Sequence, residues 1–261
     1  MKTNPTTSDH ARSNPRVSII IATFNAAETL EECIDSIVGQ SFPAWEIIVF
    51  DNVSTDGTQE ILASRETHIA HWQSAPDSGI YDAWNRALAH ARGEYVLFLG
   101  ADDSLHSPGT LERVFDEIGS QEFDLVTGRG ELVSENGVGY HVFGKPWDFR
   151  AVMRRITICH PGALHRRTLF EDYGQFDTSY RICADYDFLL RLPSDTRALF
   201  IDSALTRVRD SGVSRNRRLK TLRESFRAQA SCPRIGRVRA AFNFLDKAWR
   251  IPVAKLFGIP N

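Results

Sequence analysis

The sequence predicts an α/β protein built on a doubly wound, mostly parallel sheet, and two observations lead to this prediction. Largely apolar runs at residues 17–22, 46–50 and 95–99 lack the alternation of half-exposed strands, so they are typical of strands covered on both faces. A helical pattern follows each of the first strands, and strands recur at roughly 25 to 30 residue spacing, which favours right-handed βαβ crossovers. We therefore expect helices on both faces of one sheet.

The first two strands introduce the repeating unit. The strand at 17–22 is followed by a helix that Asn25 is expected to cap and that ends near Gly39. The second strand ends at Asp51 and leads through the loop 52–58 into a short helix. Each unit therefore places a polar loop between the end of a strand and the start of a helix.

A third unit follows the same plan. It comprises a strand at 70–73, a loop at 76–79 and a helix through residues 83–91, and the strand at 95–99 closes the series. Trp84 lies on the apolar stripe of the third helix and is expected in the core.

The pattern becomes mixed after a helix at 110–118. Strands are expected at 125–128, 131–134 and 138–143, and Asn136-Gly137 before the last of them is a hairpin signal. The remaining expected elements are a strand after Gly162, helices at 167–173 and 185–192, and a helical region from 215 onward with breaks at Cys232-Pro233 and Ile251-Pro252.

The composition is ordinary for a globular protein. Of 261 residues, 42% are hydrophobic and 25% are charged. The four cysteines form no Cys-x-x-Cys pair, so neither a disulfide framework nor a zinc site is predicted, and a reducing cytoplasm is the expected location. No uninterrupted apolar stretch reaches about 18 residues, which excludes an ordinary membrane span.

Positive charge is concentrated near the C-terminus. Residues 211–261 hold twelve Lys and Arg against two acidic residues, although the whole chain has a formal net charge of −2. The segment 238–257 interleaves apolar and basic residues at helical spacing, which predicts an amphipathic helix that binds an anionic membrane surface. Two alternatives stay open, a solvated basic helix and a helix whose apolar face packs on the protein body.

Polar side chains follow each of the first strands. Thr23 and Asn25 follow the first, Asp51 ends the second, Asp77 follows the third, and Asp102 follows the strand at 95–99. Because the carboxyl ends of parallel strands meet at one edge of a sheet, these side chains are expected to form a site there. A capping or turn role is the alternative for each acid taken alone.

Asp102 is followed directly by a second acid, Asp103. Adjacent carboxylates repel each other unless a cation or several hydrogen-bond donors keep both ionised. Oxygen ligands of this kind suit Mg²⁺ or Mn²⁺, which take one or two carboxylates together with substrate phosphates. The pair therefore predicts a metal-bound phosphate ester.

Five segments together carry a resemblance to a known family. Through residues 17–25, 47–57, 79–85, 93–103 and 184–192, the chain resembles the inverting family 2 glycosyltransferases of the GT-A fold over about residues 16–215. The resemblance implies a nucleotide-sugar-binding half at 17–104 and a smaller, mixed acceptor-binding half at 105–214. A disordered leader at 1–16 and a basic amphipathic helical tail at 215–261 complete the expected organisation.

The resemblance also implies roles for the residues at the sheet edge. The acid matching Asp51 holds the nucleotide base, and Asp102 matches the metal-bearing position of an Asp-x-Asp region whose first acid is replaced here by Gly100. Asp102 is therefore expected to hold Mn²⁺ or Mg²⁺. The other residues expected to bind the nucleotide or the donor sugar are Thr23, Asn25, Ser54, Asp77, Gly79, Asp82, Asn85 and Asp103.

Asp185 is the predicted catalytic base. It matches the acid of the family's Glu-Asp motif, with Ala184 in place of the Glu. A carboxylate within hydrogen-bond reach can remove the proton of the acceptor hydroxyl during in-line attack. Without the resemblance, a cap on the helix that follows is the favoured role of Asp185. His160 is the predicted acceptor-side residue, with a structural histidine as the alternative.

These expectations combine into an inverting, metal-dependent transfer of a single sugar. The expected donor is a UDP-sugar, and the expected acceptor is a lipid-linked or cell-surface polysaccharide reached from the cytoplasm, with the enzyme peripheral on the membrane. Processive synthases carry a Gln-x-x-Arg-Trp motif that is absent here, and nothing favours a nucleic-acid partner.

Two other function classes are alternatives to this one. Gly100 and Ala184, each in place of an acid, motivate a catalytically silent module that binds a nucleotide sugar or glycan. An aspartyl phosphotransferase is disfavoured because Val53 stands where its loop needs a second acid.

Overall fold

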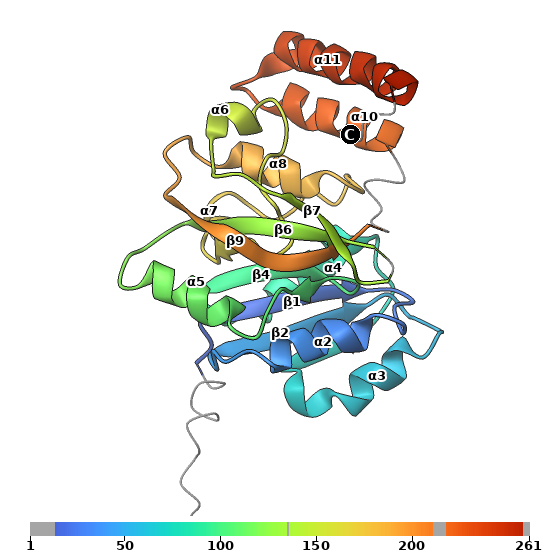
Figure 1. Ribbon diagram of the computed structural model, residues 1–261, viewed down its shortest axis with the longest axis vertical. Helices are drawn as coiled ribbons and strands as arrows, with labels where there is room; N and C mark the ends of the chain where they lie inside the picture. Colours follow the sequence, from blue (N-terminus) through green and yellow to red (C-terminus); the bar gives the residue numbers. More distant parts are fainter. Residues whose placement is uncertain (1–13, 135, 211–217, 258–261) are drawn as a thin grey trace, which may run out of the picture.

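One mixed sheet lies between two layers of helices (Figure 1). The computed structural model describes residues 14–134, 136–210 and 218–257, with side chains described as far as residue 246. The predicted leader lies outside the described residues up to position 13. Nine strands are joined in the order β3-β2-β1-β4-β8-β6-β9-β5, and β7 pairs with β6.

Parallel strands form the first half of the sheet. β1 (Val17–Thr23) lies between β2 (Trp45–Asp51) and β4 (Tyr95–Gly100), and β3 (His71–Ser74) pairs with β2. Every residue of β2 is buried, as are all but one of β1. The prediction of covered, parallel strands is confirmed.

Helices cover both faces of these strands. Ile19 and Ile21 of β1 belong to the core cluster that includes residues of α2 (Leu30–Val38) and α5 (Thr110–Ile118). Ile20 belongs instead to the cluster that includes residues of α4 (Ile80–Leu88) and α8 (Ala184–Arg191). Because alternate residues of a strand face opposite sides, the sheet is doubly wound, as predicted. Trp84 of α4 lies in this second cluster, so its predicted core position is confirmed.

Short elements connect the first strands. The helix α3 (Thr58–Ser64) and the 3₁₀ turn η1 (Glu66–His68) lead from β2 to β3.

The second half of the sheet is mixed. β6 (Leu125–Val133) runs antiparallel to β7 (Gly139–Phe143) and β8 (Leu164–Arg166). It runs parallel to β9 (Ala198–Arg209). The two-residue strand β5 (Ser104–Leu105) pairs antiparallel with β9. The β6–β7 pairing confirms the predicted hairpin. The prediction of separate strands at 125–128 and 131–134 is wrong, because β6 continues through a register shift against β9 near Arg129.

Helices α10 (Arg218–Ser231) and α11 (Gly236–Phe257) form a layer beyond α8, at the end of the molecule away from α2 and α3 (Figure 1). Gln229 of α10 donates from Nε2 to the hydroxyl of Tyr186 in α8 at 2.9 Å. Phe226 of α10 packs edge-to-face on Phe244 of α11. The first tail helix therefore packs on the protein body. The short helices α6 (Phe149–Val152) and α7 (Leu169–Asp172) precede α8 in the chain.

Two predicted helix boundaries are wrong. Asn25 does not cap α2, which begins at Leu30 after the N-cap residue Thr29; Asn25 has a left-handed backbone conformation with a φ of 49°. The break predicted at Ile251-Pro252 is not observed, because α11 continues to Phe257. A proline inside a helix removes one backbone hydrogen bond and can kink the helix without ending it.

Candidate active site

A cleft of about 630 Å³ opens at the carboxyl ends of β1 and β4, beside the start of α4. Open α/β sheets bind ligands at this edge. Five predicted site residues line the cleft, namely Thr23, Asn25, Asp77, Gly79 and Asp102. Four further polar residues that the sequence did not predict also line it, namely Thr29, Asn52, Arg181 and Lys220.

Thr23 presents an unpaired hydroxyl at the cleft. Its Oγ1 atom is buried and has no hydrogen-bond partner among the described residues. An unpaired buried hydroxyl is destabilising, so a ligand or an ordered water is the expected partner. Thr23 is thus suited to bind a polar group in the cleft.

Asn25 joins the first strand's loop to the loop after β2. Its Oδ1 accepts a hydrogen bond from the Thr55 backbone N–H at 3.0 Å, and its own backbone N–H donates to Ser54 Oγ at 2.8 Å. Asp51 lies beneath this junction and is 1% exposed. Its carboxylate accepts from both the backbone N–H and the hydroxyl of Ser54, and from Ser74 Oγ at 2.6 Å.

Asp51 and Ser54 therefore brace the loop and do not line the cleft. The neighbouring residue Asn52 does line it, and its Oδ1 accepts from the Asp77 N–H at 3.0 Å. The sequence identified this loop but did not identify the residue in it that faces the cleft.

The loop before α4 is closed by its own carboxylates. Asp77 Oδ1 accepts from the Gly79 N–H at 2.7 Å, and burial raises the pKa of Asp77. Asp82 Oδ2 accepts from the Ser78 N–H at 2.9 Å and pairs with Arg86. Gly79 has a φ of 126°, and a Cβ there would lie 2.8 Å from Arg181 Nη1, so both the backbone and the space favour glycine.

Asn85 faces away from the cleft, toward Phe176. Its Nδ2 donates to the Phe176 carbonyl at 2.8 Å, and its Oδ1 accepts from the Phe176 N–H at 3.0 Å. Both ends of the amide are thus occupied by backbone, and the structure places Asn85 outside the cleft, in contrast to its predicted donor-binding position.

The two adjacent acids converge over Gly100. A Cβ at this glycine would lie 2.7 Å from Asp102 Oδ1 and 2.9 Å from Asp103 Oδ2. Asp102 lines the cleft, whereas Asp103 is 7% exposed and accepts from the Arg209 N–H at 3.2 Å. Burial, together with the neighbouring charge of Asp102, raises the pKa of Asp103 to about 7.

This arrangement fits a divalent cation held partly by substrate. In the described part of the chain, no group of three or more His, Cys, Asp or Glu side chains is placed to hold a metal. Mg²⁺ and Mn²⁺ commonly bind through one or two carboxylates with phosphate and water completing the shell. A cation over Gly100 would also relieve the repulsion between Asp102 and Asp103.

Asp185 lies at the start of α8 and contacts α4. The Tyr81 hydroxyl lies 2.6 Å from the Ile182 carbonyl, to which it donates, and 3.1 Å from Asp185 Oδ1. Burial raises the pKa of Asp185 to about 6, against hydrogen bonds from the Tyr186 backbone and the Tyr81 hydroxyl, which lower it. Tyr81 directly follows Ile80, which lines the cleft, so Asp185 lies just behind the cleft wall.

His160 is part of the aromatic core. It is 4% exposed and stacks on Trp84 and Phe98 with ring centroids 5.7 Å and 6.0 Å away. Burial lowers its pKa to about 4, so the imidazole is neutral at neutral pH. It does not line the cleft, in contrast to the predicted acceptor-side position, because its ring packs among these aromatic side chains.

The family follows from a comparison with known proteins. The sequence profile described as Glycosyl transferase family 2 matches residues 18–174, more than half of the chain. The chain belongs to glycosyl transferase family 2. The match to this glycosyltransferase family includes the loop after β2 and Asp102, and it ends before Asp185.

Relatives of this glycosyltransferase include mycobacterial enzymes. The PGL/p-HBAD biosynthesis glycosyltransferase of Mycobacterium bovis (strain BCG / Pasteur 1173P2) is 39% identical over 183 residues, which are 68% of this chain and 69% of that protein. Uncharacterized glycosyltransferase Rv1514c of Mycobacterium tuberculosis (strain ATCC 25618 / H37Rv) is 28% identical over 215 residues, 78% of this chain and 79% of that one.

Solved structures share the fold. TarS 1-349 of S. aureus in complex with UDP has a TM-score of 0.66 at 21% identity, covering 88% of this chain and 69% of that chain. Mannosyltransferase PcManGT from Pyrobaculum calidifontis, solved with GDP-Man and Mn2+, has a TM-score of 0.67 at 24% identity, covering 93% and 74%. These similarities confirm the predicted GT-A architecture.

Proposed function

We propose that this glycosyltransferase binds a nucleotide-sugar donor in the cleft and transfers a single hexose, with inversion, to a lipid-linked or cell-surface polysaccharide acceptor. The observation that carries the proposal is the placement of Asp102 in the cleft while Tyr81, beside the cleft wall, contacts Asp185. In this proposal residues 17–104 supply most of the donor site, and residues 105–214 bind the acceptor.

Donor binding is assigned to the cleft residues. Thr23 has an unpaired hydroxyl, and Asn25 and Asn52 form the loops around it. Asp51 and Ser54 contribute by holding the second loop in place. The solved complexes of TarS with UDP and with UDP-GlcNAc support a UDP-sugar as the donor class, and PcManGT with GDP-Man supports a nucleoside-diphosphate sugar in general.

Asp102, with Asp103 behind it, is the proposed site for Mn²⁺ or Mg²⁺. When bound there, a divalent cation neutralises negative charge that develops on the departing diphosphate. The chain's contribution is the pair of carboxylates over Gly100. The Mn2+ in the PcManGT complex supports this assignment.

Asp185 is the proposed general base. With a pKa of about 6 it is ionised at neutral pH yet remains basic enough to accept a proton from an acceptor hydroxyl. The Tyr81 hydroxyl contacts Oδ1 and holds the carboxylate in place behind the cleft wall. Attack from the side opposite the leaving diphosphate inverts the anomeric carbon. Gly100 and Ala184, which motivated the silent alternative, each lie beside a carboxylate suited to its proposed role.

The proposed location is the cytoplasmic surface of an anionic membrane. The described chain contains no helix long and apolar enough to cross a bilayer. On α11, Val238, Phe242 and Leu245 are 74%, 71% and 62% exposed. A groove of about 1170 Å³ beside them is lined by Lys145, Arg150, Arg154, Arg155 and Arg239 with the acids Asp148 and Asp246.

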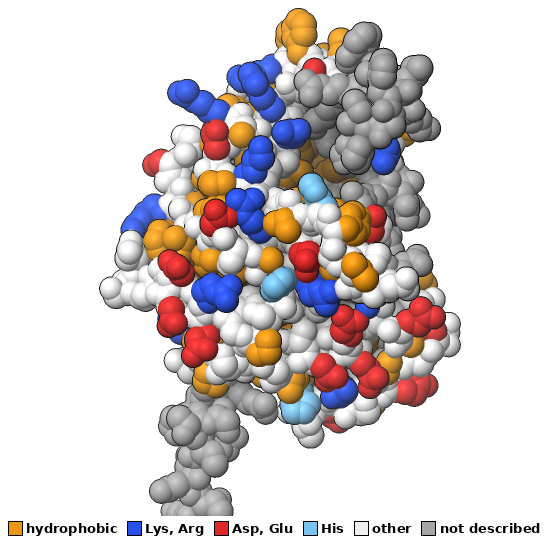
Figure 2. Space-filling model, in the orientation of Figure 1, with side chains coloured by type: hydrophobic (Ala, Val, Ile, Leu, Met, Phe, Trp, Pro, Cys, Tyr) orange, Lys and Arg blue, Asp and Glu red, His pale blue; other side chains and the backbone are white. Residues whose placement is uncertain are grey.

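In Figure 2, basic side chains gather in the upper part of the view, toward the end of the molecule formed by α10 and α11. Many of the acidic side chains lie lower in the same view. Exposed apolar residues next to a cationic groove suit an interface with anionic lipids.

A donor screen tests the proposal. Purified enzyme is incubated with a panel of UDP- and GDP-sugars, Mn²⁺ and membrane extract, and products are identified by mass spectrometry. Asp102→Asn and Asp185→Asn are each expected to lower turnover at least a hundredfold, because one weakens charge neutralisation and the other removes the base.

Asp202→Asn is the matched control, since Asp202 is an exposed carboxylate paired with Arg129. Full activity in Asp102→Asn would exclude the metal assignment. Nucleotide binding without turnover across the panel would favour the silent module.

A further inference from the structure

The tail helix α10 reaches the cleft. Lys220, in its first turn, lines the cleft together with Arg181 from the segment before α8. Arg181 is also close to the start of α4, since its Nη1 lies 2.8 Å from the position of a Cβ on Gly79. Two cations from segments far apart in the sequence therefore meet at one rim of the cleft.

Glu224 connects these two segments. Its carboxylate is almost buried and accepts hydrogen bonds from three consecutive backbone N–H groups, those of Arg181 at 3.0 Å, Ile182 at 2.8 Å and Cys183 at 3.1 Å. Lys220 Nζ lies 4.0 Å from Glu224 Oε1, one helical turn away. Three N–H donors and an ammonium group offset the cost of burying the carboxylate. A single side chain thus contacts both residues, at the backbone of Arg181 and at the ammonium group of Lys220.

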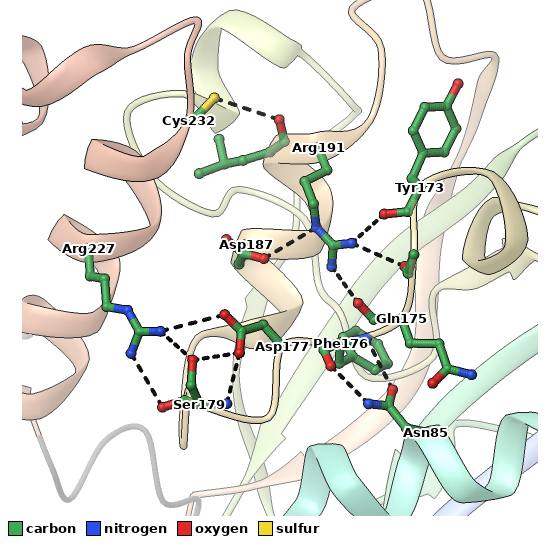
Figure 3. Close-up of polar contacts among 12 residues, drawn as sticks. Asn85, Tyr173, Gln175, Phe176, Asp177, Ser179, Asp187, Arg191, Arg227 and Cys232 are labelled. Carbon is green, nitrogen blue, oxygen red and sulfur yellow. Dashed lines mark hydrogen bonds and ion pairs between the residues drawn. The ribbon is translucent and has the colours of Figure 1, made fainter.

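The segment that carries Arg181 is also held from other directions (Figure 3). The Arg191 guanidinium in α8 donates to the carbonyls of residues 173–175 and pairs with Asp187. Arg227 of α10 bonds Ser179 and pairs with Asp177 at 3.5 Å. These contacts fix the chain segment that leads to Arg181. Binding of a ligand by Arg181 therefore costs little backbone entropy.

The charges in the cleft explain why cations are needed there. Of the fifteen residues that line it, Asp77 and Asp102 are acidic, and Arg181 and Lys220 are the basic ones. A diphosphate entering beside two carboxylates alone would be repelled. Gly100, in place of an acid, leaves fewer carboxylates to hold a cation, so protein cations have more of the phosphate charge to neutralise.

We propose that Arg181 and Lys220 bind the diphosphate of the donor and that Glu224 is the positioning residue for both. This inference rests on the proposed function, because it assumes that a nucleoside diphosphate occupies the cleft. Guanidinium and ammonium groups form charge-assisted hydrogen bonds to phosphate oxygens, which are stronger than neutral ones.

Calorimetric titration tests the assignment. Dissociation constants for UDP, GDP and the parent nucleosides are measured with and without Mn²⁺ for the wild type, Arg181→Ala and Lys220→Ala. Each variant is expected to bind the diphosphate about tenfold more weakly, with unchanged nucleoside affinity and a shallower dependence on salt. Lys220→Arg keeps the charge and is expected to bind as the wild type does.

Arg223→Ala is the matched control, because Arg223 is an exposed cation on the same helix that does not line the cleft. Glu224→Gln keeps the side-chain size and is expected to weaken diphosphate binding several-fold while the nucleoside affinity stays constant.

Wild-type affinity for the diphosphate in Arg181→Ala and Lys220→Ala would overturn the cation assignment, and an equal loss of nucleoside binding would do the same. Unchanged diphosphate affinity in Glu224→Gln would overturn its positioning role. If the wild type bound neither UDP nor GDP, the proposed donor class would fail, and this inference with it.

Discussion

Removing one hydroxyl beside Asp185 tests the proposed base in detail. Tyr81 is 5% exposed, and its hydroxyl proton is shared between the Ile182 carbonyl at 2.6 Å and Asp185 Oδ1 at 3.1 Å. Burial raises the pKa of Asp185 to about 6, and the Tyr81 hydrogen bond is one of the contacts that limit the rise. In Tyr81→Phe the pKa of Asp185 is therefore expected to rise further.

The size of the effect follows from the geometry. A hydrogen bond to an ionised group contributes about 1.5–3 kcal/mol when fully formed. Because the shorter contact of Tyr81 is to Ile182, we assign ~0.7 kcal/mol to its longer hydrogen bond with Asp185. This energy corresponds to roughly a threefold change in the acid dissociation constant of Asp185. A general base must be ionised, so kcat is expected to fall about threefold at pH 5.5 and to stay unchanged at pH 8.

The assay is kcat for sugar transfer at saturating donor and acceptor between pH 5 and 9. Tyr95→Phe is the control, because the buried Tyr95 hydroxyl also donates to a backbone carbonyl, that of Phe123 at 3.0 Å, but makes no contact with Asp185. The reasoning is refuted if the acid limb of Tyr81→Phe coincides with that of the wild type. An equal shift in Tyr95→Phe would refute it as well, since the effect would then be general destabilisation.

Two further predictions concern the core and the tail. Burial lowers the pKa of His160 to about 4 from an unfolded value near 6.5, so its contribution to stability is complete above pH 6.5 and is lost as the pH falls toward 4. In urea titrations, the free energy of unfolding of His160→Phe relative to that of the wild type should thus increase by roughly 2 kcal/mol when the pH is lowered from 7 to 5. The kcat of this variant is expected to stay within twofold of the wild-type value. A large loss of kcat would instead support the acceptor-side role of His160. For α11, the double variant Phe242→Glu and Leu245→Glu is expected to bind vesicles of phosphatidylglycerol and phosphatidylcholine at least tenfold more weakly in sedimentation, whereas Val138→Glu, at another exposed apolar residue, should match the wild type. Equal vesicle binding by all three proteins would exclude α11 as the membrane surface.

The sequence predicted the first half of the sheet well because burial on both faces leaves a simple signal. Most residues of β1 and β2 are apolar, on both faces, and lie where the runs predicted them. Since parallel strands bring their ends together, the gathering of Thr23, Asn25, Asp77 and Asp102 at one cleft was also predictable.

β9 had no comparable signal, since Asp202 and Ser203 interrupt its apolar residues and two thirds of the strand is only partly buried. The position of His160 depends on aromatic side chains from four other segments.

Site residues that are positioned by the packing of helices could not be predicted, because this packing leaves no local signal in the sequence. Lys220 and Glu224 read as parts of a basic tail. The sequence contains no local sign that Glu224 contacts residues some forty positions earlier or that Lys220 lines the cleft. Asn25 was predicted as a cap because its residue type suits one. The hydrogen bond to Thr55, thirty residues away, instead holds it in a loop.

The contact between Glu224 and residues 181–183 also bears on the timing of activity during synthesis. Chains leave the ribosome N-terminus first, and domains begin to fold as they emerge. A nascent chain that has reached the end of β9 already contains Asp102, Tyr81 and Asp185, but the three N–H groups before α8 still lack the carboxylate that they bind in the finished protein. We expect such an unfinished chain to be inactive, so that sugar is transferred only after α10 has been made and has docked.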